Sequence, residues 1–169
     1  MRSDDLKALQ APLKESYRKT PEKAVVTLAA EGGLDGDGIA CKVDTGRALV
    51  TAGLHPATGG DGTQACSGDM LLEALVACAG VTLRAVATAL DIDIAGGTVR
   101  AEGDLDFRGT LGVDKEAPVG FREIRLEFDL ETEADEEKLA TLIKLTERYC
   151  VVYQTIQQSP ASTVSYRAA

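Results

Sequence analysis

The fold of this chain is decided by residues 67–90, which read SGDMLLEALVACAGVTLRAVATAL. From Met70 to Leu90 almost every residue is apolar or small. A helix that is apolar on all sides is usually buried. Ser67 is placed to cap such a helix, and Asp69 falls in its first turn, where a carboxylate interacts favourably with the helix dipole. The pattern therefore predicts a long helix through the centre of the molecule.

The same helix is long and apolar enough to be compared with a membrane span. Glu73, Arg84 and the many alanines favour instead the central helix of a soluble protein. The first twenty residues are charged and lack the apolar core of a signal peptide. We therefore expect a cytoplasmic protein without membrane contact.

Composition excludes several classes of function. The chain has 169 residues, enough for a single domain with a sizeable core, and a net charge of −9. This charge argues against binding to nucleic acid or to an anionic membrane surface. The four cysteines should be reduced in the cytoplasm. Cys41, Cys66 and the single histidine, His55, do not form a zinc-ligand pattern, so we expect no metal and no other cofactor.

The rest of the chain predicts an alternation of strands and helices. The spacing of leucines before Pro21 predicts a helical extension at residues 1–23, followed by a single domain at residues 24–169. Strands are expected at residues 24–30, 39–44, 48–52, 98–107, 121–131 and 163–167, and a second helix at residues 135–158. This order of elements is typical of an α+β fold.

Phe121–Glu131 is the clearest of these strands. Ile124, Leu126, Phe128 and Leu130 alternate with charged residues. Such alternation is typical of an antiparallel sheet with one buried face and one face in water.

Two cysteines are the strongest candidates for chemistry. Cys78 lies in the middle of the central apolar helix, and Cys150 lies in the second predicted helix. Free cysteines usually behave as small buried apolar residues. If the fold brings these two together, one thiolate could attack a peroxide and the other thiol could resolve the product. The residues alone leave both interpretations open.

The contexts of the two cysteines resemble the OsmC/Ohr family of osmotically inducible and organic hydroperoxide resistance proteins. The similar segments are SGDMLLEALVAC at residues 67–78 and ERYCVV at residues 147–152. The resemblance implies curved antiparallel sheets wrapped around buried central helices in an intertwined homodimer. It further implies that Cys78 reduces organic hydroperoxides in defence against oxidative stress and that Cys150 resolves its sulfenic acid. A dithiol reductant, such as a lipoyl-linked one, is implied to regenerate the pair.

The sequence departs from that family at two positions. An arginine and a glutamate flank the reactive cysteine in the family, and Leu34 and Gly68 occupy the corresponding positions here. Candidates for replacement supporting roles are Asp69, Glu73, Arg47 and His55. Whether the protein is an enzyme is therefore left open. The alternative is an OsmC-fold module that binds a small apolar ligand or acts as a redox sensor.

Overall fold

The computed structural model describes residues 50–107, 109–112 and 114–168 in full. At residues 31–34, 40–44, 49 and 108 it describes the backbone alone. It also describes the isolated residues 2, 4, 8, 11 and 19. The predicted strand at residues 24–30, the leucines that predicted the N-terminal helix, and Arg47 lie outside the described residues.

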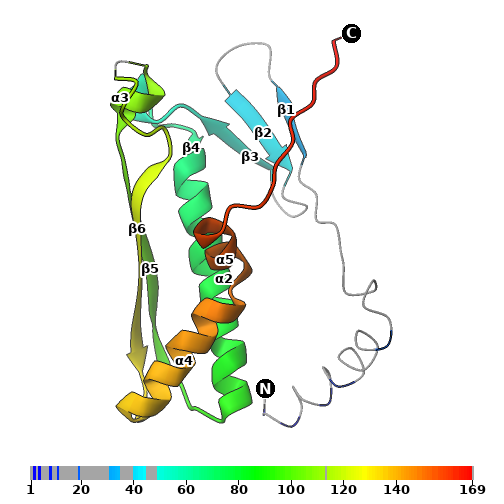
Figure 1. Cartoon of the computed structure of the whole chain (residues 1–169), viewed down its shortest axis with the longest axis vertical. Helices are drawn as coiled ribbons and strands as arrows, with labels where there is room; N and C mark the ends of the chain where they lie inside the picture. Colours follow the sequence, from blue (N-terminus) through cyan, green and yellow to red (C-terminus); the bar gives the residue numbers. More distant parts are fainter. Residues whose placement is uncertain are drawn as a thin grey trace.

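The chain folds as an α+β protein in which strands and helices are mixed along the sequence (Figure 1). The elements are β1 (Glu31–Leu34), β2 (Ala40–Asp44), β3 (Leu49–Gly53), the 3-10 helix η2 (Pro56–Thr58), β4 (Ala65–Cys66), α2 (Ser67–Leu90), β5 (Gly96–Leu105), α3 (Phe107–Thr110), β6 (Phe121–Glu131), α4 (Glu136–Tyr149) and α5 (Val151–Gln157). One sheet has the order β1-β2-β3-β4, antiparallel except for the parallel pair β3–β4, and the other is the antiparallel hairpin β5–β6.

Helix α2 is the centre of the molecule. It runs alongside the β5–β6 hairpin and packs against β5, α4 and α5 (Figure 1). Its buried residues are Leu75, Ala79, Leu83, Val86 and Ala87. The opposite face of α2 is uncovered in the single chain, where Val81 is 72% exposed. The sequence predicted that α2 is buried on all sides, but within one chain one of its faces stays exposed. In the described part of the chain α2 is also the one helix whose length and hydropathy would suit a membrane span, a test that core helices also pass.

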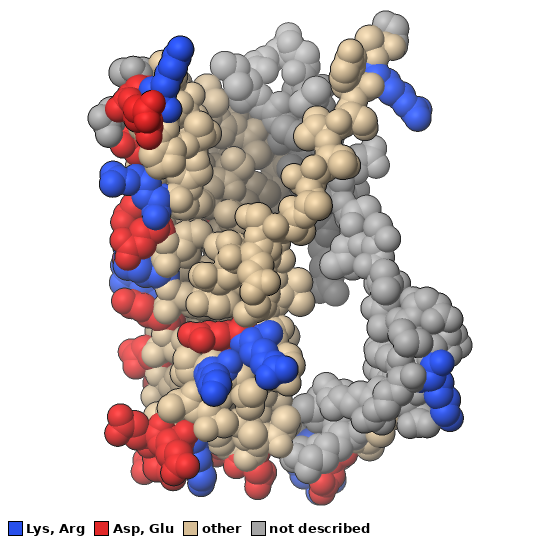
Figure 2. Space-filling model, viewed as in Figure 1, with Lys and Arg blue, Asp and Glu red and all other residues tan. Residues whose placement is uncertain are grey.

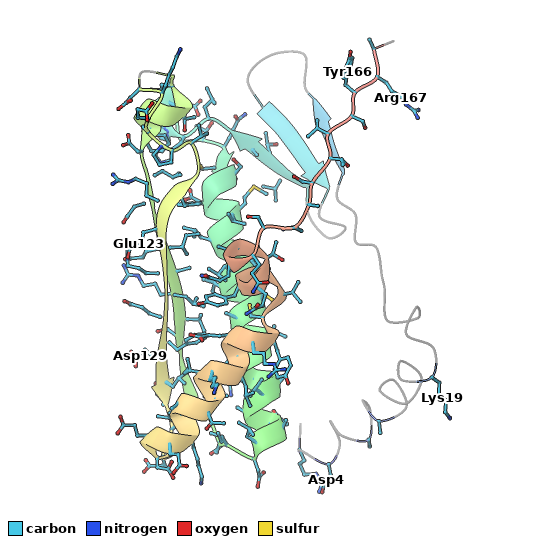
Figure 3. The ribbon with its side chains drawn as sticks, in the orientation of Figure 1. Asp4, Lys19, Glu123, Asp129, Tyr166 and Arg167 are labelled. Carbon is cyan, nitrogen blue, oxygen red and sulfur yellow. The ribbon has the colours of Figure 1, made fainter. Side chains whose placement is uncertain are left out.

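Strand β6 has the predicted bounds and the predicted alternation. Ile124, Leu126 and Phe128 pack against the buried cluster formed by Leu75, Ala79 and Cys150. Glu123 and Asp129 point away from the helices (Figure 3). Figure 2 shows charged side chains along this hairpin and little charge over the area of α5.

Two predicted helix boundaries are corrected by the structure. Cys66, not Ser67, is the N-cap of α2, and its side chain makes no capping hydrogen bond. The predicted helix at residues 135–158 is two helices, because Cys150 has extended backbone angles (φ −73°, ψ 108°). Asp135 caps α4, since its carboxylate accepts a hydrogen bond from the Lys138 N–H at 2.8 Å.

The predicted last strand at residues 163–167 is wrong for the single chain. The segment has no strand partner, and Val164 and Tyr166 are 99% and 92% exposed. Tyr166 and Arg167 lie on the C-terminal segment that extends away from α5 (Figure 3). The alternating sequence is compatible with a strand, but a strand forms only where a neighbouring strand supplies backbone hydrogen bonds.

Candidate thiol site

The break between α4 and α5 creates the site. The N–H of Cys150 donates to the Thr146 carbonyl at 2.9 Å and so closes α4, while the Cys150 carbonyl accepts from the Gln154 N–H at 2.9 Å and so opens α5. The first N–H groups of a helix have no partner within that helix. The backbone N–H groups of Val151 and Val152 are therefore free to bind another acceptor.

The acceptor is the sulfur of Cys78. Burial opposes ionisation of this thiol, but hydrogen bonds from the Val152 N–H, the Cys150 thiol, the Val151 N–H and the Thr82 hydroxyl together lower the pKa of the Cys78 thiol below its usual value. Donors to the charged form of a group favour that form. Cys78 thus lies in front of a helix N-terminus, a position that stabilises thiolates.

Cys150 differs from Cys78 in acidity and exposure. Burial raises the pKa of the Cys150 thiol, and the neighbouring Cys78 sulfur raises it further. Cys150 is 1% exposed, whereas Cys78 is partly exposed; both are free thiols. The pair can therefore hold one thiolate, on Cys78, beside one protonated thiol, on Cys150.

The wall around the two sulfurs is apolar. Leu75, Ala79, Val152, Tyr153 and Ile156 pack in the same cluster as Cys78 and Cys150. Among the described residues no group of three or more His, Cys, Asp or Glu side chains could hold a metal ion. The reactive groups of this site are therefore the two thiols, and the side chains packed with them are apolar.

Asp69 and Glu73 do not reach Cys78 within the chain. They precede it on α2 by nine and five residues, which corresponds to rotations of roughly 180° and 140° around the helix axis. Both are exposed and line a shallow groove with Leu72 and Val76. The structure therefore places these two carboxylates on a different face of α2.

His55 belongs to the loop that precedes α2. Its Nδ1 accepts a hydrogen bond from the Ala57 N–H at 3.0 Å, and its ring stacks on Phe107 with a centroid distance of 4.9 Å. These contacts cap η2 and attach it to α3. Arg84, the cation nearest in sequence to Cys78 on α2, donates to the Ile94 carbonyl at 2.7 Å and is engaged there.

The nearest neighbours of Gly68 are the β5–β6 hairpin and Cys66, not Cys78 or Cys150. A Cβ atom at this position would lie 3.5 Å from Leu105 Cδ1, 3.5 Å from Phe121 Cζ and 3.6 Å from Cys66 Sγ. A glutamate at position 68 would therefore start among apolar groups of its own chain. The backbone of Leu34 lies in β1, opposite Cys41 of β2.

Sequence analysis missed the donors that surround Cys78. The N–H groups of Val151 and Val152 become available only because the chain leaves the helix at Cys150. Two consecutive β-branched residues after Cys150 are a weak signal for such a break, since valine has a lower helix propensity than unbranched residues. Thr82 could have been found, because residues four apart are neighbours on a helix.

The sequence model of OsmC-like proteins matches residues 60–165, which contain both thiols, α2 and the β5–β6 hairpin. The chain belongs to the OsmC-like family. No curated protein matches the chain.

Solved structures of OsmC-like proteins share this fold. An OsmC-like protein from Mycoplasma pneumoniae aligns with 20% identity and a TM-score of 0.65 over 79% of this chain and 89% of its own. An organic hydroperoxide resistance protein OsmC from Legionella pneumophila gives 16% identity and a TM-score of 0.61 over 79% and 90%. The organic hydroperoxide resistance protein OhrB of Bacillus subtilis gives 20% identity and a TM-score of 0.53 over 79% and 93%. At these identities the likeness establishes the fold.

Proposed function

We propose that this OsmC-like protein reduces organic hydroperoxides through Cys78 and Cys150. The observation that carries the proposal is the contact between the two thiols, with the pKa of Cys78 lowered and that of Cys150 raised. Attack on a peroxide requires a thiolate, and a neighbouring thiol is needed for resolution. The family supports the proposal, since proteins named for organic hydroperoxide resistance share its fold.

The reaction proceeds in two displacements. The Cys78 thiolate attacks one peroxide oxygen and the O–O bond breaks, which leaves Cys78 sulfenic acid and, after protonation of the alkoxide, an alcohol. The Cys150 sulfur then attacks the sulfenic sulfur, so that a disulfide forms and water leaves. A dithiol of the lipoyl class returns the pair to two thiols by thiol–disulfide exchange and leaves as a disulfide. Both displacements use only the sulfur atoms of the chain, so no resident cofactor is proposed.

The apolar wall favours organic over inorganic peroxides. The side chains of Leu75, Val152, Tyr153 and Ile156 pack in the same cluster as the two thiols. An alkyl or aryl group loses unfavourable water contact there, at roughly 25 cal/mol per Å² of apolar surface buried. Hydrogen peroxide gains nothing from such a wall.

We also propose that the protein works as a cytoplasmic homodimer. The exposed face of α2 carries Val81, and the exposed Tyr149 and Val151 lie next to the buried Cys150. A second copy could cover these apolar side chains, as the family resemblance implies. Sedimentation should show a dimer at micromolar concentration; a stable monomer would contradict this assembly.

Stopped-flow oxidation by cumene hydroperoxide tests the proposed reaction. We expect Cys78→Ser to abolish it, and Cys150→Ser to allow a single turnover that leaves a sulfenic acid, detected by dimedone labelling. Cys66→Ser is the matched control and should react like the wild type. If the wild-type thiols resist the peroxide, the chemistry is wrong, and the outcome would favour a module that binds an apolar ligand.

A further inference from the structure

The junction between α4 and α5 interrupts a helix that the local sequence would otherwise continue. Residues 149–152 read YCVV and contain neither glycine nor proline, the residues that most often break helices. The local pattern predicts one helix at residues 135–158. Cys150 is nevertheless extended and belongs to neither helix, and α5 turns away from the axis of α4 (Figure 1). Contacts made by residues outside this short segment therefore stabilise the break.

The break frees a backbone carbonyl near the end of α4. In a continuous helix the Val151 N–H would donate to the Glu147 carbonyl, four residues earlier. Within the described residues 136–157 this hydrogen bond is absent, because the extended Cys150 separates the two helices. A carbonyl that loses its helical donor is satisfied by a side chain, by water or by a tighter turn.

The side chain of Gln154 satisfies this carbonyl. Its Nε2 donates to the Glu147 carbonyl oxygen at 2.8 Å. The carbonyl can only accept, so the amide nitrogen, not the amide oxygen, is the group that faces it. Gln154 is half-buried on α5 and lines a shallow groove at the junction together with Tyr149 and Val151. The Gln154 amide thus takes the place that the Val151 N–H would have in a continuous helix.

This hydrogen bond requires the broken arrangement. Gln154 and Glu147 are seven residues apart, so in one continuous helix they would be separated by about 10.5 Å along the axis. A glutamine side chain is too short to span that distance. A contact that is made in only one of two conformations shifts the equilibrium toward that conformation. The hydrogen bond therefore favours the broken helix over the continuous one.

The broken arrangement is also the one in which the two thiols meet. The buried Cys150 packs with Leu75, Ala79 and Cys78 of α2. We propose that Gln154 is a positioning residue, which stabilises the break through the Glu147 carbonyl and so keeps Cys150 beside Cys78. This inference rests on the proposed function for its purpose, since resolution of a sulfenic acid requires a neighbouring thiol. The hydrogen bond itself does not depend on that function.

The test compares four variants of the full chain. Gln154→Leu and Gln154→Glu remove the donor, Gln154→Lys keeps a donor on a long side chain, and Gln157→Leu is the matched control on the same helix. Leucine, glutamate, lysine and glutamine have similar helix propensities, so the comparison isolates the donor. Two donor-free variants are used so that the test survives if one of them fails to fold.

Two readouts follow the junction. The NMR chemical shifts of Cα and Cβ of Cys150 report the ratio of extended to helical conformers at this residue. Mass spectrometry in dithiothreitol buffers reports the equilibrium between the two thiols and the Cys78–Cys150 disulfide. We expect the donor-free variants to lower the conformer ratio about threefold, as for the loss of one exposed hydrogen bond. The disulfide should become less stable in proportion to the extended fraction, and Gln154→Lys and Gln157→Leu should match the wild type in both readouts.

Two results would overturn the proposal. One is a wild-type conformer ratio in the folded donor-free variants. The other is an equal decrease in Gln154→Lys or Gln157→Leu, which would trace the effect to packing. Neither readout involves a peroxide, so each proposal can fail separately. A lowered ratio in a protein whose wild type does not reduce peroxide would refute the peroxidase proposal alone, while peroxide turnover with an unchanged ratio would refute the role of Gln154 alone.

Discussion

Replacement of Val151 by proline should raise the pKa of Cys78 without disturbing the fold. Val151 is the first residue of α5, and proline is favoured at this position because its missing N–H has no helical partner. The residue before a proline must be extended, which Cys150 already is. The valine side chain is 69% exposed, so little packing is lost. The substitution therefore removes chiefly one donor to the Cys78 sulfur.

The size of the effect follows from the donors that remain. The Val152 N–H, the Cys150 thiol and the Thr82 hydroxyl still reach the sulfur when the Val151 N–H is gone. The loss of one hydrogen bond to a charged group among several should cost about 1 kcal/mol of thiolate stabilisation. At 1.36 kcal/mol per pKa unit, the pKa rises by about 0.7 unit and the thiolate fraction falls about fivefold below the midpoint.

The assay follows alkylation of Cys78 by iodoacetamide across pH, with circular dichroism to confirm the fold. Val151→Ala is the matched control, because it loses the side chain and keeps the N–H, and its midpoint should equal that of the wild type. If folded Val151→Pro also titrated like the wild type, the N-terminus of α5 would not be the source of the acidity of Cys78. An equal shift in Val151→Ala would trace the effect to the side chain.

Three further outcomes are expected. Mild oxidation followed by peptide mapping should recover a disulfide between Cys78 and Cys150, and a dominant bridge to any other cysteine would contradict the pairing. Leu142→Ala should lower the free energy of unfolding in urea by about 3 kcal/mol, because Leu142 is 0% exposed; a loss below about 1 kcal/mol would argue against this core. Arg125→Ala breaks an exposed ion pair with Asp104 at 2.6 Å and should cost no more than about 1 kcal/mol in the same experiment, with unchanged peroxide kinetics.

The sequence predicted the parts of the fold that depend on local pattern. The alternation in Phe121–Glu131 gave the strand bounds, because one face of β6 packs on the helices and the other faces water. The long apolar run at residues 70–90 predicted α2, because an apolar helix is stabilised by the elements that pack against it. The predicted strand at residues 163–167 failed because pairing depends on a neighbour and not on local alternation.

The candidate site was predictable only in part. The family resemblance pointed to Cys78 and Cys150, which the structure places in contact. It also directed attention to side chains that could replace the family's arginine and glutamate. Within the single chain Asp69 and Glu73 line a groove on another face of α2, and His55 accepts a hydrogen bond from the Ala57 N–H. Backbone donors carry no side-chain signature in a sequence, so the contribution of α5 could not be found from residue types.

A thiolate held by backbone N–H groups depends on geometry more than on residue type. The family resemblance places Leu34 and Gly68 where the family has a charged pair, and the pKa of Cys78 is lowered in part by backbone groups that any residues at positions 151 and 152 would supply, proline excepted. What must be preserved is the extended backbone of Cys150, which ends α4 and leaves the first turn of α5 open. A substitution that made residues 136–157 one continuous helix would remove these donors without touching either sulfur. The acidity of Cys78 and its access to Cys150 therefore depend on the same break in the chain.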